Sequence, residues 1–161
     1  MKKNSLVFLV SAILLLSACL KKQEPIAEPD PLIQFAKDTL IIKKYLADSI
    51  PAKRLDQTGV YYQIIKPGTG TVKPEAKSEI KIKVNGRLLS GKVFTNPKDT
   101  LKNILGNQIS GVQFGLPLIR KGGRIRLILA SYYAFGPLGN YGQTVPPNAV
   151  VDLDINLIDI K

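Results

Sequence analysis

The chain has 161 residues, no histidine, one cysteine and a formal net charge of +11 at pH 7. With no histidine and a single thiol, most zinc, haem and cysteine-nucleophile sites are excluded, so we expect no metal and no cofactor. The basic residues are scattered along the predicted strands, which favours a solvated lysine surface, or attraction to an anionic membrane or an acidic partner, over nucleic-acid binding.

The chain begins with the pattern of a secretory signal. Two lysines precede the apolar stretch 6–16, which is short for a bilayer span, and small residues stand directly before Cys19. This arrangement resembles a bacterial lipoprotein signal, in which residues 1–18 are removed and Cys19 is lipidated. Export of this kind also argues against a nucleic-acid partner. The remaining 143 of the 161 residues suffice for one domain with a core.

Residues 19–31 are rich in proline, lysine and glutamate, so they predict a flexible tether. The segment 32–58 then predicts an amphipathic helix, Leu32 to Asp48, and a linker that begins near Pro51. Its polar positions include Lys37, Asp38, Lys43 and Lys44. Its apolar stripe consists of Phe35, Ile42, Tyr45 and Leu46. This stripe either packs on the domain or contacts a partner or a second copy.

Several stretches alternate as half-buried strands do. Gly59 to Ile65 predicts a strand followed by a turn at 67–70, and Ile80 to Val84 predicts a second strand with both of these residues facing the interior. Asn85-Gly86 on its own looks like a hairpin turn. Two more strands have one apolar face each, formed by Ile125, Leu127 and Leu129 and by Leu153, Ile155 and Leu157.

The acidic residues of the last strand are interpreted as a solvated face rather than a carboxylate cluster; they are Asp152, Asp154 and Asp159. Ser110 is expected to cap a short helix that runs to about Ile119. Glycines cost a helix about 1 kcal/mol each and an interior proline more, so Gly111, Gly115 and Pro117 imply a helix held by packing.

The loop between the last two strands is punctuated by glycine and proline and edged by aromatic residues, as expected for a pocket rim. Its motifs Tyr133-Ala134-Phe135-Gly136 and Val145-Pro146-Pro147-Asn148-Ala149 resemble the end of an FKBP-type peptidyl-prolyl isomerase. Further motifs, at Val84, Gly91, Leu105, Ile109 and Lys121, keep the family's order, and the resemblance covers residues 59–161.

The resemblance implies an α+β fold in which a curled antiparallel sheet wraps around the short helix, with the N-terminal helix added. It also implies that the strand continues through Asn85-Gly86. The catalytic positions carried over from the family are Phe94, Ile109 and Phe135, with the backbone N–H of Ile109 as a donor. The substrate-binding positions carried over are Val84, Thr95, Leu101, Val112, Val145 and Leu153.

Phe94 and Ile109 match the family, whereas other pocket positions depart from it. Val84, Thr95, Val112, Phe135 and Leu153 stand where the family has tyrosine, aspartate, tryptophan, tyrosine and phenylalanine. Each position is also compatible with plain core. Rotating a prolyl amide needs no acid or base, because a dry apolar pocket tolerates the twisted amide better than the planar one.

We therefore predict a lipid-anchored peptidyl-prolyl isomerase that assists the folding of exported, proline-containing polypeptides. Lipidated Cys19 would hold it in the cell envelope, with the outer membrane as the expected membrane and its face left open. The alternative is a catalytically weak or inactive FKBP-like binding or chaperone subunit of an outer-membrane assembly or secretion machine. Phe135 lacks the hydroxyl that the family's tyrosine donates at this position. This loss motivates the alternative, because it removes transition-state stabilisation.

Overall fold

A computed structural model of the protein describes residues 30–47 and 50–161. The predictions for the signal segment, for Cys19 and for most of the tether lie outside these residues, as does the expected helix end at Asp48. Within the described ranges, no helix combines the length and the apolar character needed to cross a membrane.

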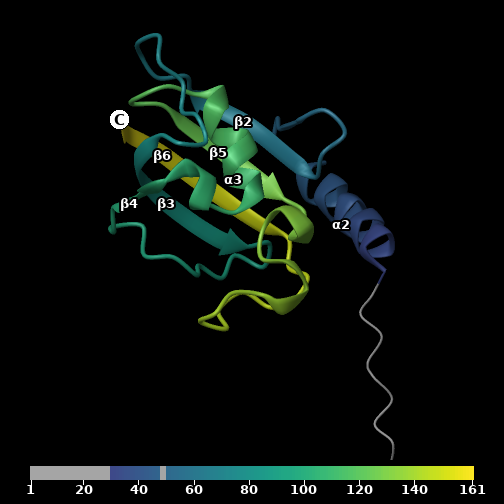
Figure 1. The fold of residues 1–161 in the computed structure, drawn as a ribbon. Helices are drawn as coiled ribbons and strands as arrows, with labels where there is room; N and C mark the ends of the chain where they lie inside the picture. Colours follow the sequence, from purple (N-terminus) through teal and green to yellow (C-terminus); the bar gives the residue numbers. More distant parts are fainter. Residues whose placement is uncertain (1–29, 48–49) are drawn as a thin grey trace, which may run out of the picture.

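One antiparallel sheet curls around a short helix, α3 (Figure 1). Its six strands lie in the order β1-β2-β5-β6-β3-β4. Their bounds are Lys53–Arg54 for β1, Val60–Lys66 for β2, Glu79–Leu88 for β3, Leu101–Ile104 for β4, Arg124–Leu129 for β5 and Val151–Ile160 for β6. This confirms the predicted α+β class, and β1 and β4 are the strands that the sequence pattern did not indicate.

The inner face of the sheet forms the main core. Leu127 of β5 lies opposite Leu153 of β6, so the apolar faces predicted for these two strands share one side. On β3, Ile80 and Ile82 are fully buried and Val84 packs against the same core, as the alternation predicts. The strands therefore present a continuous apolar surface to α3.

Strand β3 runs without a break through Asn85 and Gly86, which pair with β6. The interpretation of these two residues as a hairpin turn is therefore wrong, and the continuous strand implied by the family resemblance is right. Gly86 instead lets the Phe94 ring lie close to the strand backbone, because a Cβ at this position would lie 2.7 Å from that ring. The chain turns further on, where the Leu88 N–H donates to the Lys92 carbonyl.

Helix α3, Ser110–Gly115, is followed by a 3-10 turn, η3, Leu116–Leu118. The expected break at Pro117 is thus seen as a change from α-helical to 3-10 geometry. The expected Ser110 cap is wrong, because Ile109 occupies the N-cap position and no side chain caps the helix. The first turn of α3 is held by backbone bonds and by packing on the sheet.

The glycines of α3 explain how a poor helix former is held in place. A Cβ at Gly111 would lie 2.5 Å from the Leu129 side chain, and a Cβ at Gly115 would lie 2.5 Å from Leu127. Both distances are shorter than carbon atoms tolerate. The glycines therefore give up helix propensity so that the helix backbone can lie directly on β5.

Helix α2, Pro31–Leu46, lies against the outer face of the sheet at one end (Figure 1). Asp30 caps it by accepting a hydrogen bond of 2.8 Å from the Leu32 N–H. Ile42 is fully buried against Ile128 and Ala130. The structure thus has the first of the two predicted alternatives, in which the apolar stripe packs on the domain; its members Phe35, Tyr45 and Leu46 join the same cluster.

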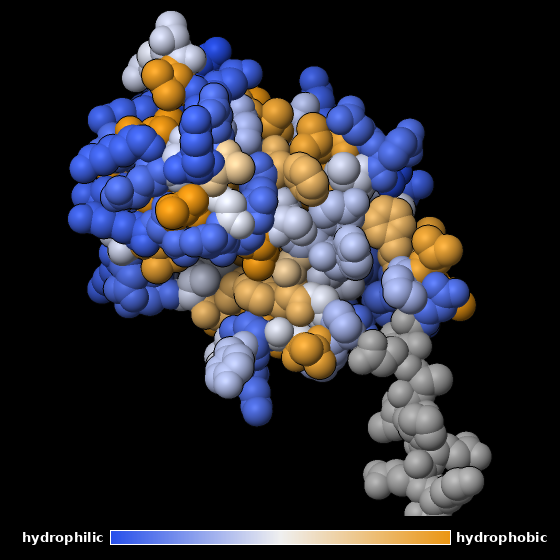
Figure 2. All heavy atoms as spheres, in the orientation of Figure 1, coloured by the Kyte–Doolittle hydropathy of each residue, from blue (hydrophilic) through white to orange (hydrophobic). Residues whose placement is uncertain are grey.

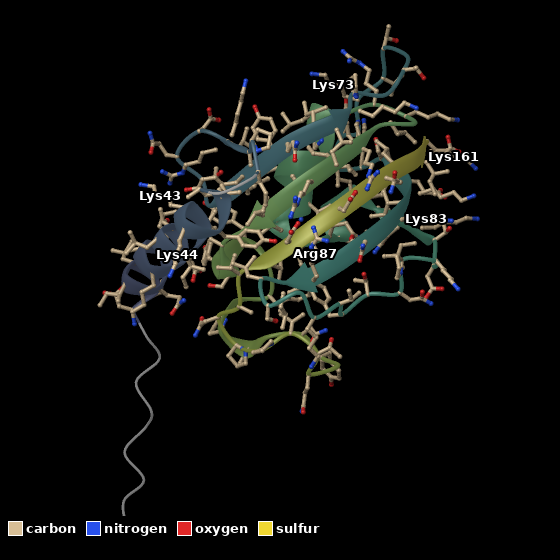
Figure 3. All side chains as sticks on the ribbon, turned by 180° about the vertical axis from the view of Figure 1, so that it is seen from behind. Lys43, Lys44, Lys73, Lys83, Arg87 and Lys161 are labelled. Carbon is tan, nitrogen blue, oxygen red and sulfur yellow. The ribbon has the colours of Figure 1, made fainter. Side chains whose placement is uncertain are left out.

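The interpretation of Asp152 as solvated is wrong, because α2 and neighbouring side chains cover this part of the outer face. Its carboxylate has no exposed surface and accepts hydrogen bonds from Tyr45 Oη (2.9 Å), Arg87 Nε (3.0 Å) and Arg126 Nη2 (2.6 Å). Arg87 is labelled on this face in Figure 3. The other two carboxylates stay partly exposed; Asp154 pairs with Arg124, and Asp159 with Lys121.

Asp38 of α2 is also buried, although the sequence pattern places it among the polar positions. Its Oδ2 atom accepts hydrogen bonds from the Ser131 N–H (2.7 Å) and the Ser131 hydroxyl (2.6 Å). Its Oδ1 atom accepts one from Gln34 Nε2 at 2.7 Å. Ser131 starts the 3-10 turn η4, Ser131–Tyr133, so the carboxylate ties α2 to the loop between β5 and β6.

Candidate active site

A cavity of about 220 Å³ opens between β3, β4, the start of α3 and the β5–β6 loop. Eight of the nine pocket positions carried over from the family line it: Val84, Phe94, Thr95, Leu101, Ile109, Val112, Phe135 and Leu153. Ile82, Asn107 and Gln108 complete the lining. The fold thus brings together side chains from six separated stretches of the sequence.

Val145 does not line this cavity. It is buried in the main core, with 1% of its surface exposed, and its N–H donates to Asn140 Oδ1 at 2.8 Å. Asn140 Nδ2 in turn donates to the Thr144 hydroxyl at 2.7 Å. Val145 therefore anchors the long loop to the core, and it supports the pocket from outside the lining.

Phe94 and Phe135 form an aromatic wall. Their ring centroids are 5.8 Å apart and the ring planes meet at 88°, which is the favoured edge-to-face arrangement. Both side chains are half-buried. Phe94 follows β3 and Phe135 lies in the β5–β6 loop, so this contact closes the loop over the cavity.

Thr95 stabilises the strand next to this wall. Its hydroxyl accepts a hydrogen bond from the Gly86 N–H (2.7 Å) and donates one to the Val84 carbonyl (2.9 Å). The residue after Phe94 is therefore fastened to β3 by two bonds. Because these bonds already use its hydrogen, the Thr95 hydroxyl has no proton left to donate to a ligand.

Ile109 supplies a backbone donor at the N-terminus of α3. Its carbonyl accepts hydrogen bonds from the Val112 N–H (2.9 Å) and the Gln113 N–H (3.2 Å). Its own N–H donates to no other residue within the described part of the chain. An N–H left free beside an apolar cavity is suited to bind a carbonyl oxygen of a ligand.

The sequence reasoning missed the segment that holds this donor. Gln113 Nε2 donates to the carbonyls of Gln108 (2.7 Å) and Gly106 (3.0 Å), which ties the turn before Ile109 to α3. Asn107 and Gln108 thereby reach the cavity lining. Their position directly before the predicted donor was the available signal, but no alternation or motif marks them.

No ionisable side chain is found in the cavity lining within the described residues. The lining consists of aliphatic and aromatic groups, one engaged hydroxyl and two amides. Such a site cannot provide acid–base catalysis from its own side chains. It can exclude water from a bound peptide bond and donate a hydrogen bond to it.

Comparison with known proteins places this geometry in a family. Residues 70–158 match the model of the FKBP-type peptidyl-prolyl cis-trans isomerases. The chain belongs to this family. FkpA of Escherichia coli strain K12 is 32% identical over 111 residues, which cover 67% of this chain and 40% of that protein. The macrophage infectivity potentiator of Trypanosoma cruzi is 31% identical over 107 residues, covering 65% of this chain and 54% of that protein.

Solved structures of the family agree with the fold. The crystal structure of E. coli FkpA superposes with a TM-score of 0.70 at 28% identity, covering 98% of this chain and 70% of that chain. A peptidyl-prolyl cis-trans isomerase of Pseudomonas syringae gives a TM-score of 0.68 at 25% identity, covering 82% of this chain and 96% of that chain. This FKBP-type chain spans about two fifths of the length of the curated E. coli FkpA proteins.

Proposed function

We propose that this protein is a peptidyl-prolyl cis-trans isomerase that acts on exported polypeptides while a lipid on Cys19 holds it in the cell envelope. The observation that carries the proposal is the uncharged cavity beside a free backbone donor, Ile109 N–H, in a chain of the FKBP family. We assign Phe94, Ile109 and Phe135 to catalysis. Val84, Thr95, Leu101, Val112 and Leu153 bind the substrate, and Val145 supports the loop.

The chemistry requires no reacting side chain. The planar amide owes its barrier of about 18–20 kcal/mol to resonance, which also separates charge between nitrogen and oxygen. A twisted amide has lost this resonance, so an apolar cavity disfavours it less than the planar form. The Phe94–Phe135 wall excludes water, and the Ile109 N–H holds a substrate carbonyl while the bond rotates. Each 1.36 kcal/mol gained in the transition state raises the rate tenfold.

The size of the cavity supports a small occupant. At about 220 Å³ it is below the roughly 300–1,000 Å³ typical of pockets for drug-sized ligands. A single prolyl ring fits this scale, and the flanking peptide would lie along the rim. The polypeptide around the proline is therefore held by the rim rather than by a deep cleft.

The donor is tested by removing its hydrogen without disturbing the fold. Ile109 has φ −58° and ψ 145°, which proline adopts, and the preceding Gln108 is extended at φ −85° and ψ 166°. Because the Ile109 N–H makes no bond in the described structure, Ile109→Pro deletes only the proposed substrate contact and part of the side chain. Ile109→Ala is the matched control, since it shortens the side chain and keeps the N–H.

We expect the wild-type protein to accelerate isomerisation of proline tetrapeptides in a protease-coupled assay. Ile109→Pro should lower kcat/KM about tenfold more than Ile109→Ala, as the loss of one hydrogen bond predicts. Equal activity of the two variants would remove the N–H from the mechanism. If micromolar wild-type protein gives no acceleration at all, the chain is instead a non-catalytic binding or chaperone subunit.

The aromatic wall is tested by two further variants. Phe94→Ala should abolish activity by opening the wall to water, whereas Phe135→Tyr should maintain or raise it by adding a donor. Both proteins should melt close to the wild-type temperature if these half-buried rings line a cavity. A loss of about 3–5 kcal/mol in Phe94→Ala, with a destabilised Phe135→Tyr, would assign the rings to the core instead.

The lipid anchor has a separate test. Cys19→Ala should abolish the lipid mass increment measured by mass spectrometry and weaken the attachment of the protein to isolated membranes. A wild-type protein that shows no lipid mass increment over Cys19→Ala would contradict lipidation. Isomerase activity is measured independently of this result, so the anchor and the chemistry can fail separately.

A further inference from the structure

We propose that the outward face of α2 lies on the surface of an anionic lipid bilayer and so orients the isomerase domain next to the membrane. The inference rests on the proposed lipid anchor only because that anchor brings the helix close to a bilayer. Its evidence is the surface of the helix itself.

Helix α2 carries large apolar side chains on the side that the domain leaves uncovered. Leu32 is 77% exposed, Ile33 54%, Leu40 68% and Ile41 48%, in a helix of 16 residues. Figure 2 shows apolar atoms at the surface where Figure 1 places this helix. Packing on the domain accounts for Ile42 and its neighbours, but it does not account for a second apolar surface on the same helix.

The exposed charges of α2 all have one sign. Lys37, Lys43 and Lys44 are exposed, and Figure 3 labels two of them on the helix. The helix has one acidic residue, Asp38, which is buried against Ser131. An exposed helix face that combines apolar side chains with lysines is the pattern of helices that lie in a membrane interface. The lysine stems can pack along the apolar surface while their ammonium groups reach anionic headgroups.

The position of the helix along the chain favours a membrane as the occupant. Eleven residues, 20–30, separate Cys19 from the start of α2 at Pro31. Even fully extended, a segment of this length reaches only about 40 Å. A lipid on Cys19 would therefore keep α2 within this distance of the bilayer, which strongly raises the local concentration of lipid at the helix.

A second copy of the chain suits this face less well. Symmetric pairing through the same surface would bring the lysines of both copies into one apolar seam. Within its bounds helix α2 has no exposed carboxylate to pair with them, since Asp38 is engaged inside the domain, and the exposed Asp30 beside it is engaged in capping the helix through the Leu32 N–H. A bilayer with anionic headgroups satisfies both the apolar and the charged groups.

Docking through α2 leaves the proposed active site accessible. Helix α2 packs against the outer face of the sheet through Ile128, whereas the cavity opens beside α3 and is lined by Leu153 of the inner face. The membrane and the substrate therefore approach different sides of the sheet.

The experiment uses the mature chain, 19–161, with Cys19→Ser, so that no lipid contributes to binding. It contains every described helix and strand, and its natural thiol is removed. A single cysteine is then introduced on the helix, Leu40→Cys, and labelled with an environment-sensitive fluorophore. The matched control is Val72→Cys, which is 64% exposed in the loop between β2 and β3.

With vesicles of phosphatidylglycerol and phosphatidylethanolamine, we expect a blue shift for the label at position 40 and none at position 72. Replacing the three exposed lysines of α2 by glutamine should weaken this binding about a hundredfold, since each lysine near an anionic surface contributes about fivefold. The chain with all three lysines should bind vesicles of phosphatidylcholine alone about as weakly as the glutamine variant binds the anionic vesicles.

Three results would overturn the proposal. One is a label at position 40 that does not respond to anionic vesicles. Another is an equal response at both labelled positions, which would indicate non-specific adsorption. The third is a concentration-dependent dimer without vesicles that shields position 40, which would assign the face to a second copy. Because this chain carries no lipid and its isomerase activity is not measured, these outcomes are independent of the proposed function.

Discussion

Replacing Asp152 by asparagine tests whether the buried charge cluster holds α2 and the sheet together. The Asp152 carboxylate is 0% exposed, and its partners Arg126 and Arg87 have side chains that are 18% and 31% exposed. Arg126 binds it in a bidentate manner, with Nε to Oδ1 at 2.9 Å and Nη2 to Oδ2 at 2.6 Å. Removing one partner of a buried ion pair costs about 3–5 kcal/mol, because the remaining charge stays desolvated.

The partial exposure of both arginines allows some rehydration, so the lower end of this range applies to Asp152→Asn. We expect a loss of about 3 kcal/mol in the free energy of unfolding at pH 7, or a drop in Tm of about 6–12 °C for a domain of this size. Urea denaturation monitored by circular dichroism gives the free energy directly. The m-value should stay unchanged, since the fold is retained.

Asp154→Asn is the matched control on the same strand. Asp154 also binds an arginine, Arg124, through two short hydrogen bonds, but the arginine side chain is 47% exposed. Exposed pairs contribute only about 0–1 kcal/mol, so this variant should lose less than 1 kcal/mol. The reasoning is refuted if the two variants lose the same stability, because burial would then not decide the strength of the pair.

Three further predictions follow from buried contacts. Burial raises the pKa of Asp152, but hydrogen bonds from Arg126 and Tyr45 outweigh burial and hold the pKa below its ordinary value of 3.8. The stability that the carboxylate contributes is therefore present above about pH 4 and is lost as the pH falls through the lowered pKa, so wild type and Asp152→Asn should converge in stability as the pH is lowered below about 4. Gly111→Ala should destabilise by about 1–2 kcal/mol in thermal unfolding, because the new methyl group would clash with Leu129, whereas Gly142→Ala, with no atom closer than 4.0 Å, should change little. Asp38→Ala should lose about 2–3 kcal/mol and increase hydrogen exchange in the loop that begins at Ser131; unchanged exchange would contradict the link between helix and loop.

The buried faces of the strands were predictable because the alternation of apolar and polar residues within each strand shows which face is buried. Ile125, Leu127 and Leu129 alternate with arginines, and a period of two residues requires no knowledge of the rest of the fold. Asp152 lies on an equally clear alternation, yet its burial depends on a helix more than a hundred residues earlier in the chain. A local pattern gives the face of a strand, and it cannot show what covers that face.

The loop composition indicated a pocket rim, but the residues that line the pocket were predictable only through the family resemblance. Val84, Phe94 and Leu153 lie far apart in the sequence, and no composition or spacing brings them together. Ordered motifs supplied the missing information, and the structure gathers eight of the nine carried-over residues around one cavity. Asn107 and Gln108 were not predicted as lining residues, because their position at the cavity depends on the hydrogen bonds that Gln113 makes to the turn.

Helix α2 connects the region outside the family match to the chemistry proposed inside it. Asp38 binds the backbone and hydroxyl of Ser131, and Phe35 packs on Tyr133 with ring centroids 6.4 Å apart. The segment held by these contacts leads within four residues to Phe135, which closes the aromatic wall of the cavity. These buried contacts therefore help to hold the loop of the proposed active site against α2. Loosening α2 should therefore also loosen the loop that carries Phe135, even though the helix lies outside the family match.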